Sequence, residues 1–291
     1  MADEGLVAVP GADGIWEALY TPDDHDETYA FLLKGCKAKE LKAKCEEALE
    51  KYKAGEIGPC VYLERMMVCE MPKGGGVLIY SAIPITDTLK AQVQEKGGCK
   101  VIIVPTSEHA KFHKGWMEAY PEAVVVCPGG DSMLPVIEEL GDAANVMDYR
   151  YPAKWAKNAI KATSGLGVEI HESAGFQEIF LLHRKSKSLL TCDAFYLGCA
   201  DKKDKAGWKN FPADVWKECY FEAYCEKSPC HLPIYRTFLS PEQKASIAKV
   251  IKKVLSWKAE RVMSARSGKT SEGGAEAAKK IIEGHWGWCS S

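Results

Sequence analysis

The feature that most constrains the fold is a continuous apolar run, CKVIIVP, at residues 99–105. Such a run is typical of a strand that is buried on both faces of a sheet. The polar segment TSEHAKFHKGW follows it directly, and the unit WMEAYPEAVVVCPGG then supplies another helix and strand. Polar residues at the carboxyl end of a buried strand are where mixed α/β folds place their functional sites. The sequence therefore predicts an α/β fold with a candidate site just after residue 105.

The first third of the chain predicts a helix, a hairpin and a second helix. Apolar residues at helical spacing predict an amphipathic helix over residues 39–53, which we expect to pack on the main body. Residues 60–84 form two β-rich runs around a glycine-rich turn, which indicates a hairpin. Thr86 and Asp87 favour the start of a helix that ends at Gly97–Gly98.

The second half of the chain adds strands and two terminal helices. Strands are expected in GVEIHES, GFQEIFLLHR and SLLTCDAFYL, the last two as a hairpin. Ser240 and the Pro-Glu-Gln that follows predict a capped helix start, and RVMSA and AEAAKKIIEG predict a strand and a last helix. This order favours a layered α/β sandwich with mixed sheets. A doubly wound fold is disfavoured because no glycine-rich phosphate loop follows a strand. We assign residues 1–58 to an N-terminal helical extension and residues 59–291 to the main domain.

Composition excludes several classes of protein. With 46% hydrophobic and 27% charged residues, the chain is neither mainly disordered nor collagenous. A net charge of -2 provides no global basic field for nucleic acid. The start of the chain lacks the pattern of an export signal, and no apolar run approaches the ~18 residues that span a bilayer. We therefore expect a cytoplasmic protein with a small-molecule substrate or ligand and with neither nucleic acid nor membrane as a partner.

The twelve cysteines are scattered and form no C-x-x-C pair. In a reducing compartment most are expected to be buried thiols that act as small hydrophobic residues. One cluster near the end of the cysteine-rich stretch could be interpreted as a zinc site, and it consists of Cys219, Cys225, Cys230 and His231. The spacings between these residues differ from those of a typical zinc knuckle. The aromatic residues between Trp208 and Tyr224 are interpreted either as a pocket wall or as a core patch.

Four segments together carry a family resemblance. They are RMMVCEMPKGGGVLIYSAIPITDTLKAQV, VIIVPTSEHAKFHKGWMEAYPEAVVVCPGG, EIFLLHRKSKSLLTCDAFYL and WKAERVMSARSG. In order and spacing, over roughly residues 60–285, the chain resembles a little-characterised family of metallo-β-lactamase-like proteins of bacteria, plants and algae. The resemblance implies an αββα sandwich with mixed sheets, helices on the outer faces and any site at the edge between the sheets. It also implies kinship with a superfamily dominated by metal-dependent hydrolases.

The chain departs from the metal-binding pattern of that superfamily. A typical member carries H-x-H-x-D-H after the strand that ends here at Pro105, whereas this chain keeps two histidines four apart, His109 and His113. The strand-end aspartate of the family corresponds to Asp193, and the final histidine is replaced by Arg266. The resemblance therefore implies an incomplete site, in which a complete dinuclear zinc centre is not expected.

The residues that remain still suggest a metal site. If the segment after the strand turns helically, His109 and His113 face one side, and Asp193 adds a carboxylate. Two imidazoles and one carboxylate would form a mononuclear site with open positions, which suits zinc and also ferrous iron. Alternatively, the two histidines lie exposed on a loop, and Asp193 only caps the end of its strand.

Three further residues are candidates for catalysis. Glu108 and Glu178 are spare carboxylates that would act as an additional ligand or a general base. Arg266 would offer a fixed positive charge to an anionic substrate. The alternatives are that Glu178 binds a backbone group at the sheet edge and that Arg266 is only a salt-bridge partner. His171 and His183 are interpreted as packing residues, and His285 as part of an exposed end.

The sequence leaves two functional hypotheses open. The first is a metallo-β-lactamase-like hydrolase with an impaired or mononuclear zinc or iron site that acts on a small anionic ester, lactone or thioester. The second is a non-catalytic, metal-free binding or interaction protein that retains the fold. A redox protein is disfavoured because paired cysteines are missing from the sequence.

Overall fold

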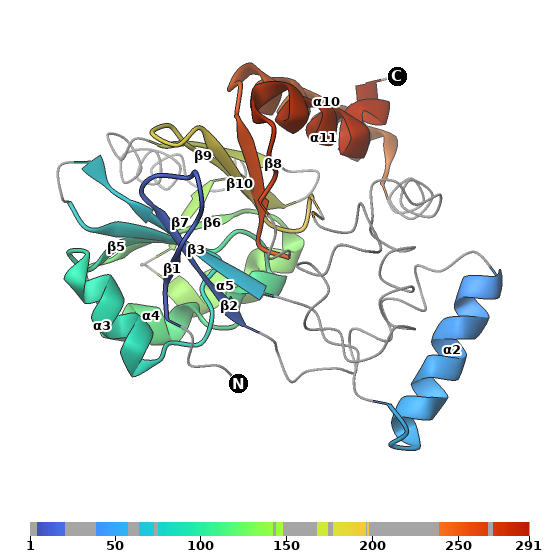
Figure 1. The fold of residues 1–291 in the computed structure, drawn as a ribbon, viewed down its shortest axis with the longest axis horizontal. Helices are drawn as coiled ribbons and strands as arrows, with labels where there is room; N and C mark the ends of the chain where they lie inside the picture. The colour runs from blue at the N-terminus through green and yellow to red at the C-terminus, as the bar shows by residue number, and fades with distance from the viewer. Residues whose placement is uncertain are drawn as a thin grey trace.

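Two β-sheets stacked face to face form the centre of the computed structural model (Figure 1). The structure describes residues 5–20, 39–57, 64–72, 75–141, 144–147, 168–173, 177–195, 197, 239–266 and 270–290. The aromatic segment from Trp208 to Tyr224 and the cluster of Cys219, Cys225, Cys230 and His231 lie outside the described residues. Within the described part of the chain, no helix has both the length and the apolar character needed to traverse a bilayer.

The larger sheet is mixed and has seven strands. Their spatial order is β1 (Val7–Ala8), β2 (Ile15–Tyr20), β3 (Glu64–Glu70), β4 (Val77–Tyr80), β5 (Cys99–Ile103), β6 (Val124–Pro128) and β7 (Ala144–Met147). Strands β1 to β4 pair antiparallel, and β4 to β7 pair parallel. The expected hairpin over residues 60–84 is β3 and β4, so this prediction is confirmed.

The smaller sheet is also mixed. Its four strands lie in the order β11 (Arg261–Ser264), β10 (Ser188–Thr191), β9 (Glu178–His183) and β8 (Val168–Ser173). The β9–β10 hairpin is confirmed, and β11 pairs parallel with β10. This parallel pairing places the carboxyl ends of β10 and β11 side by side, which brings the residues after them to one edge.

Helices cover both outer faces of the stacked sheets (Figure 1). The larger sheet carries α3 (Asp87–Glu95), α4 (His113–Ala119) and α5 (Leu134–Leu140), and the smaller carries α10 (Pro241–Ser256) and α11 (Gly274–Trp286). Along β5, Ile102 packs toward the helices and Val101 and Ile103 pack between the sheets. Because both faces are covered, the strand is apolar apart from the exposed Lys100 near its start. The predicted αββα sandwich is confirmed.

Several elements differ from the sequence prediction. Strands β1 and β2 belong to the larger sheet, so residues 1–58 are not solely a helical extension. Their short runs lack a long apolar pattern, and they become strands because β2 pairs with β3 and β1 pairs with β2. The predicted helix α2 (Lys39–Lys53) is present and lies apart from both sheets in Figure 1, so its expected packing on the main body stays a prediction. His285, expected at an exposed end, is fully buried against Phe195.

The start of α10 provides a direct test of the capping prediction. The Ser240 hydroxyl accepts a hydrogen bond from the Gln243 N–H, and the Gln243 side chain accepts one from the Ser240 N–H. Changing Ser240 to alanine removes the first bond and leaves a helix N–H without its acceptor. We expect the free energy of unfolding to fall by about 1 kcal/mol. Chemical denaturation checks this value, and an unchanged midpoint would contradict the prediction.

Candidate functional site

The candidate site lies at the edge where the carboxyl ends of strands from both sheets meet. Its side chains follow β4, β5, β10 and β11: Ser81, Thr106, Glu108, His109, Cys192, Asp193 and Arg266. The peptide N–H of Ile179, in β9, donates to the Pro105 carbonyl, which joins the two sheets at this edge. Residues distant in the sequence are therefore brought together by the stacking of the sheets.

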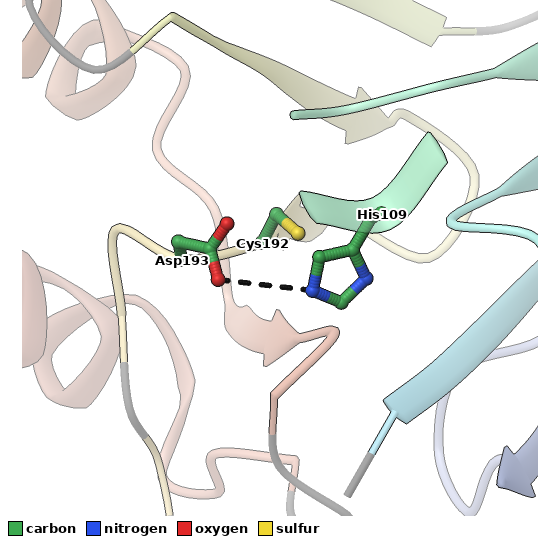
Figure 2. A group of neighbouring side chains, drawn as sticks. All are labelled: His109, Cys192 and Asp193. Atoms are coloured by element: carbon green, nitrogen blue, oxygen red, sulfur yellow. Dashed lines mark ion pairs between the residues drawn. The ribbon is translucent and has the colours of Figure 1, made fainter. Parts of the chain in front are cut away.

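His109 is buried and held by a hydrogen bond on one ring nitrogen. Its Nδ1 lies 2.7 Å from the Ser81 hydroxyl, directly after β4, where Ser81 has a φ of 60°. Its Nε2 lies 3.7 Å from Asp193 Oδ1 and is buried without a hydrogen-bond partner. Figure 2 shows the His109 ring and the Asp193 carboxylate facing each other, with Cys192 beside them. The free nitrogen of His109 is thus aimed at the carboxylate.

Asp193 has partners on both of its carboxylate oxygens. Oδ2 accepts a hydrogen bond from the Thr106 hydroxyl at 2.8 Å, and Oδ1 accepts one from Arg266 Nε at 2.5 Å. The other end of the Arg266 guanidinium forms an ion pair with Glu108. Burial by itself raises the pKa of the Asp193 carboxyl, but Arg266 and His109 together hold that pKa well below its usual range. Asp193 is therefore an anion at neutral pH.

Glu178 supports the chain segment that carries Asp193. Its carboxylate is fully buried and accepts hydrogen bonds from three successive backbone N–H groups, those of Cys192, Asp193 and Ala194. Burial and the nearby Asp193 charge raise the pKa of Glu178 to about 8, against the lowering effect of these three bonds. Glu178 thus fixes the turn after β10 and with it the position of Asp193.

Cys192 completes a group of metal-ligand atoms. Its thiol is fully buried, 3.9 Å from the Thr106 hydroxyl, and burial together with the Asp193 charge raises its pKa well above the usual range. Ligand atoms of His109, Cys192 and Asp193 all lie within 4.8 Å of one another, and no other such group of three or more occurs among the described residues. Imidazole, thiolate and carboxylate are all zinc ligands, so the donor set fits zinc.

The structure brings together two of the three predicted metal ligands. His109 and Asp193 meet, but His113 does not join their group, and its Nδ1 is instead paired with the Ala110 carbonyl. The expectation that both histidines face one side is wrong because the chain makes a tight helical turn at residues 108–110 before α4 begins at His113. The alternative of exposed histidines is also wrong, since each is only 2% exposed.

The three predicted catalytic residues lie at this edge, with different partners. Glu108 and Arg266 pair with each other, and Arg266 also binds Asp193. Glu178 matches the alternative in which it binds backbone groups, and its full burial leaves it no contact with solvent. His183 is a packing residue as expected, hydrogen-bonded to the Ser186 hydroxyl. The His171 side chain lies outside the described side chains.

Three site residues were not predicted from the sequence: Ser81, Thr106 and Cys192. Thr106 begins the polar segment after β5, and Ser81 is the first residue after β4, so their positions at strand ends were the available signal. Cys192 immediately precedes Asp193 but resembles the other buried cysteines of the chain. Only the spatial grouping distinguishes it from them.

Comparison with solved structures supports the fold. The structure is similar to a metal-soaked Flv1 flavodiiron core from Synechocystis sp. PCC6803, with a TM-score of 0.53, 11% identity, and coverage of 98% of this chain and 61% of that one. It is similar to VMB-1, with a TM-score of 0.51, 8% identity, and coverage of 99% and 98%. A metallo-β-lactamase from Pontibacter korlensis has a TM-score of 0.47 and 8% identity, with 98% of each chain covered.

The first two of these similarities place the chain in the metallo-β-lactamase fold class, as the sequence resemblance predicted. At such low identities the likeness concerns the fold alone. This chain spans about three fifths of the length of the flavodiiron core, at 61%. No protein-family model matches the sequence. No curated protein matches it either.

Proposed function

We propose that the protein is a cytoplasmic metal-dependent hydrolase with a single-metal site, acting on a small anionic ester, lactone or thioester. The observation that carries the proposal is the group of His109, Cys192 and Asp193, whose ligand atoms lie within 4.8 Å of one another. The fold class, known for metal-binding members, and the position of the group at the edge between the sheets add support.

The residues present fit one metal ion. His109 Nε2 is buried, lacks a hydrogen-bond partner and is oriented toward Asp193, as expected of a nitrogen that coordinates a metal. The bond between His109 Nδ1 and Ser81 would fix the ring and leave Nε2 for coordination. With the thiolate of Cys192 in place of His113, the ligand set favours zinc over ferrous iron.

The chain's own residues would bind and orient the substrate. When bound, the metal supplies a Lewis acid that lowers the pKa of a coordinated water and polarises a substrate carbonyl. Arg266 would attract an anionic group of the substrate through its guanidinium, which is the fixed cation of the site. Glu108, whose side chain is 64% exposed, would accept a proton from an attacking water.

The alternative is a metal-free binding protein, and one observation favours it. Both Asp193 oxygens already have partners, Arg266 and Thr106, so the carboxylate is neutralised without an ion. In that case the same guanidinium would bind an anionic ligand without catalysis. The two functions therefore differ in whether His109 and Cys192 hold a metal.

Metal content and hydrolysis test the proposal together. We expect about one equivalent of zinc in protein purified without chelators, measured by elemental analysis, and slow hydrolysis of a panel of small anionic esters, lactones and thioesters. Changing His109 to alanine is expected to remove the zinc and to lower kcat/KM by about a thousandfold. Changing His113 to alanine serves as the matched control and should retain the zinc. A metal-free protein whose ester hydrolysis is the same in both variants would refute the proposal.

A further inference from the structure

We propose that the Arg266 guanidinium is a built-in competitor that binds the same Asp193 oxygen as the metal and so weakens metal binding at this site. This inference rests on the proposed function in that it concerns the same ligand group. It assigns Arg266 a role beyond substrate attraction: the affinity of the site for a metal ion would be set by an internal cation.

The competition follows from a single shared atom. Asp193 Oδ1 accepts the hydrogen bond of Arg266 Nε at 2.5 Å, and the same oxygen lies 3.7 Å from His109 Nε2. The other oxygen is bound by the Thr106 hydroxyl at 2.8 Å. A metal ion held between His109 and Asp193 therefore meets an oxygen whose negative charge is already balanced by the guanidinium.

The position of Arg266 is fixed by the fold. Its peptide N–H donates to the Ser264 hydroxyl at 3.1 Å, and that hydroxyl donates to the Cys192 carbonyl at 2.9 Å. These bonds tie the end of β11 to the end of β10, so the arginine emerges directly beside Asp193. The Arg266 side chain is only 6% exposed, and at such a site a second cation is screened weakly by solvent.

Glu108 acts in the opposite direction. It pairs with the outer end of the guanidinium and shares the positive charge of Arg266 between two carboxylates. If Glu108 is neutralised, the Arg266 charge is no longer shared between these two carboxylates. The guanidinium then holds Asp193 more tightly and repels a metal more strongly. Removal of the arginine and removal of the glutamate are therefore expected to change metal affinity in opposite directions.

Cobalt titration tests this pair of opposite effects. Co²⁺ is added to the metal-free full chain, and binding is followed by its visible absorption bands, which also report thiolate ligation by Cys192. We expect Arg266→Gln to bind Co²⁺ about tenfold or more tightly than the wild type. We expect Glu108→Gln to bind it about threefold more weakly, a smaller effect because Glu108 is largely in solvent.

Matched controls come from an ion pair at the other end of β10. Lys187 and Glu260 pair on the surface, with side chains 58% and 38% exposed, just before β10 and β11 begin. Lys187→Gln and Glu260→Gln make the same charge changes away from the site and should bind Co²⁺ like the wild type. Circular dichroism confirms that each variant is folded. If Arg266→Gln does not fold, the Glu108→Gln titration alone decides.

The outcomes separate this inference from the proposed function. Equal affinity of the wild type, Arg266→Gln and Glu108→Gln would overturn the competition while leaving a metal site in place. Binding by Arg266→Gln alone would support the competition and refute a metal-dependent function for the natural chain. Failure of every folded variant to bind Co²⁺ would overturn both.

Discussion

Changing Glu178 to alanine is expected to lower the free energy of unfolding by about 3–5 kcal/mol, because three buried donors lose their acceptor at once. The carboxylate accepts hydrogen bonds of 2.7, 2.9 and 2.9 Å from the N–H groups of Cys192, Asp193 and Ala194. Each N–H left unpaired in a site closed to solvent costs about 1–3 kcal/mol, and a water that enters the space recovers part of this cost.

Urea denaturation at about pH 6.5 measures the effect of Glu178→Ala under the two-state assumption. Glu260→Ala is the control, because the Glu260 side chain forms an exposed pair with Lys187 and its loss should lower stability far less. Glu178→Ala should also displace the Asp193 carboxylate from its position in the site, which a lower Co²⁺ affinity would reveal. If Glu178→Ala were as stable as Glu260→Ala, the three hydrogen bonds would not be holding the turn after β10.

Stability is expected to fall as the pH rises toward 8, and Glu178 is again the cause. Its pKa is raised to about 8 in the folded protein by burial and by the charge of Asp193. The unfolded chain ionises a glutamate near about pH 4.3, so between these values the folded state binds one more proton. A group whose pKa is higher in the folded protein than in the unfolded chain contributes its full stabilisation of the fold at pH values below the unfolded pKa. This contribution is lost as the pH rises through the folded pKa. The slope is about 1.4 kcal/mol per pH unit at most.

Over about pH 6.5 to 8, the difference between the wild type and Glu178→Gln isolates this effect from the other titrating groups, which both proteins share. Burial lowers the pKa of His183, so this residue makes the stability rise with pH. The rise ends above the pKa that histidine has in the unfolded chain. The lowered pKa of Asp193 contributes fully throughout this range. Denaturation of Glu178→Gln, in which the group cannot ionise, should give a flat profile where the wild type declines. Parallel profiles for the two proteins would contradict the assignment.

The elements predicted correctly are those specified by nearby residues. The β3–β4 hairpin, α3 with its Thr86 cap and α10 with its Ser240 capping box each depend on patterns a few residues long. Strands β1 and β2 were missed because β2 becomes a strand through pairing with the distant β3, and β1 then pairs with β2. Helix α5 was missed for a similar reason: at seven residues, it is too short to show a clear period.

For the candidate site, the sequence identified residues with suitable chemistry, and the fold decided which of them lie together. His109, Asp193 and Arg266 were identified from strand ends and from the family resemblance, and the structure places them together. The role of His113 depended on assuming a continuous helix, whereas the chain turns tightly before α4 and directs that ring elsewhere. Cys192 carries no distinctive pattern, and its proximity to His109 arises only where two sheets meet.

The sequence by itself determined the layered α/β architecture, because apolar period, caps and turns are local properties that each segment retains in any context. Only the tertiary structure decided which side chains share the edge of the sandwich. That choice depends on the parallel pairing of β10 with β11 and on the stacking of one sheet over the other, and both join residues far apart in the chain. It is the parallel pairing of β10 with β11 that places a guanidinium on the carboxylate that a metal would need.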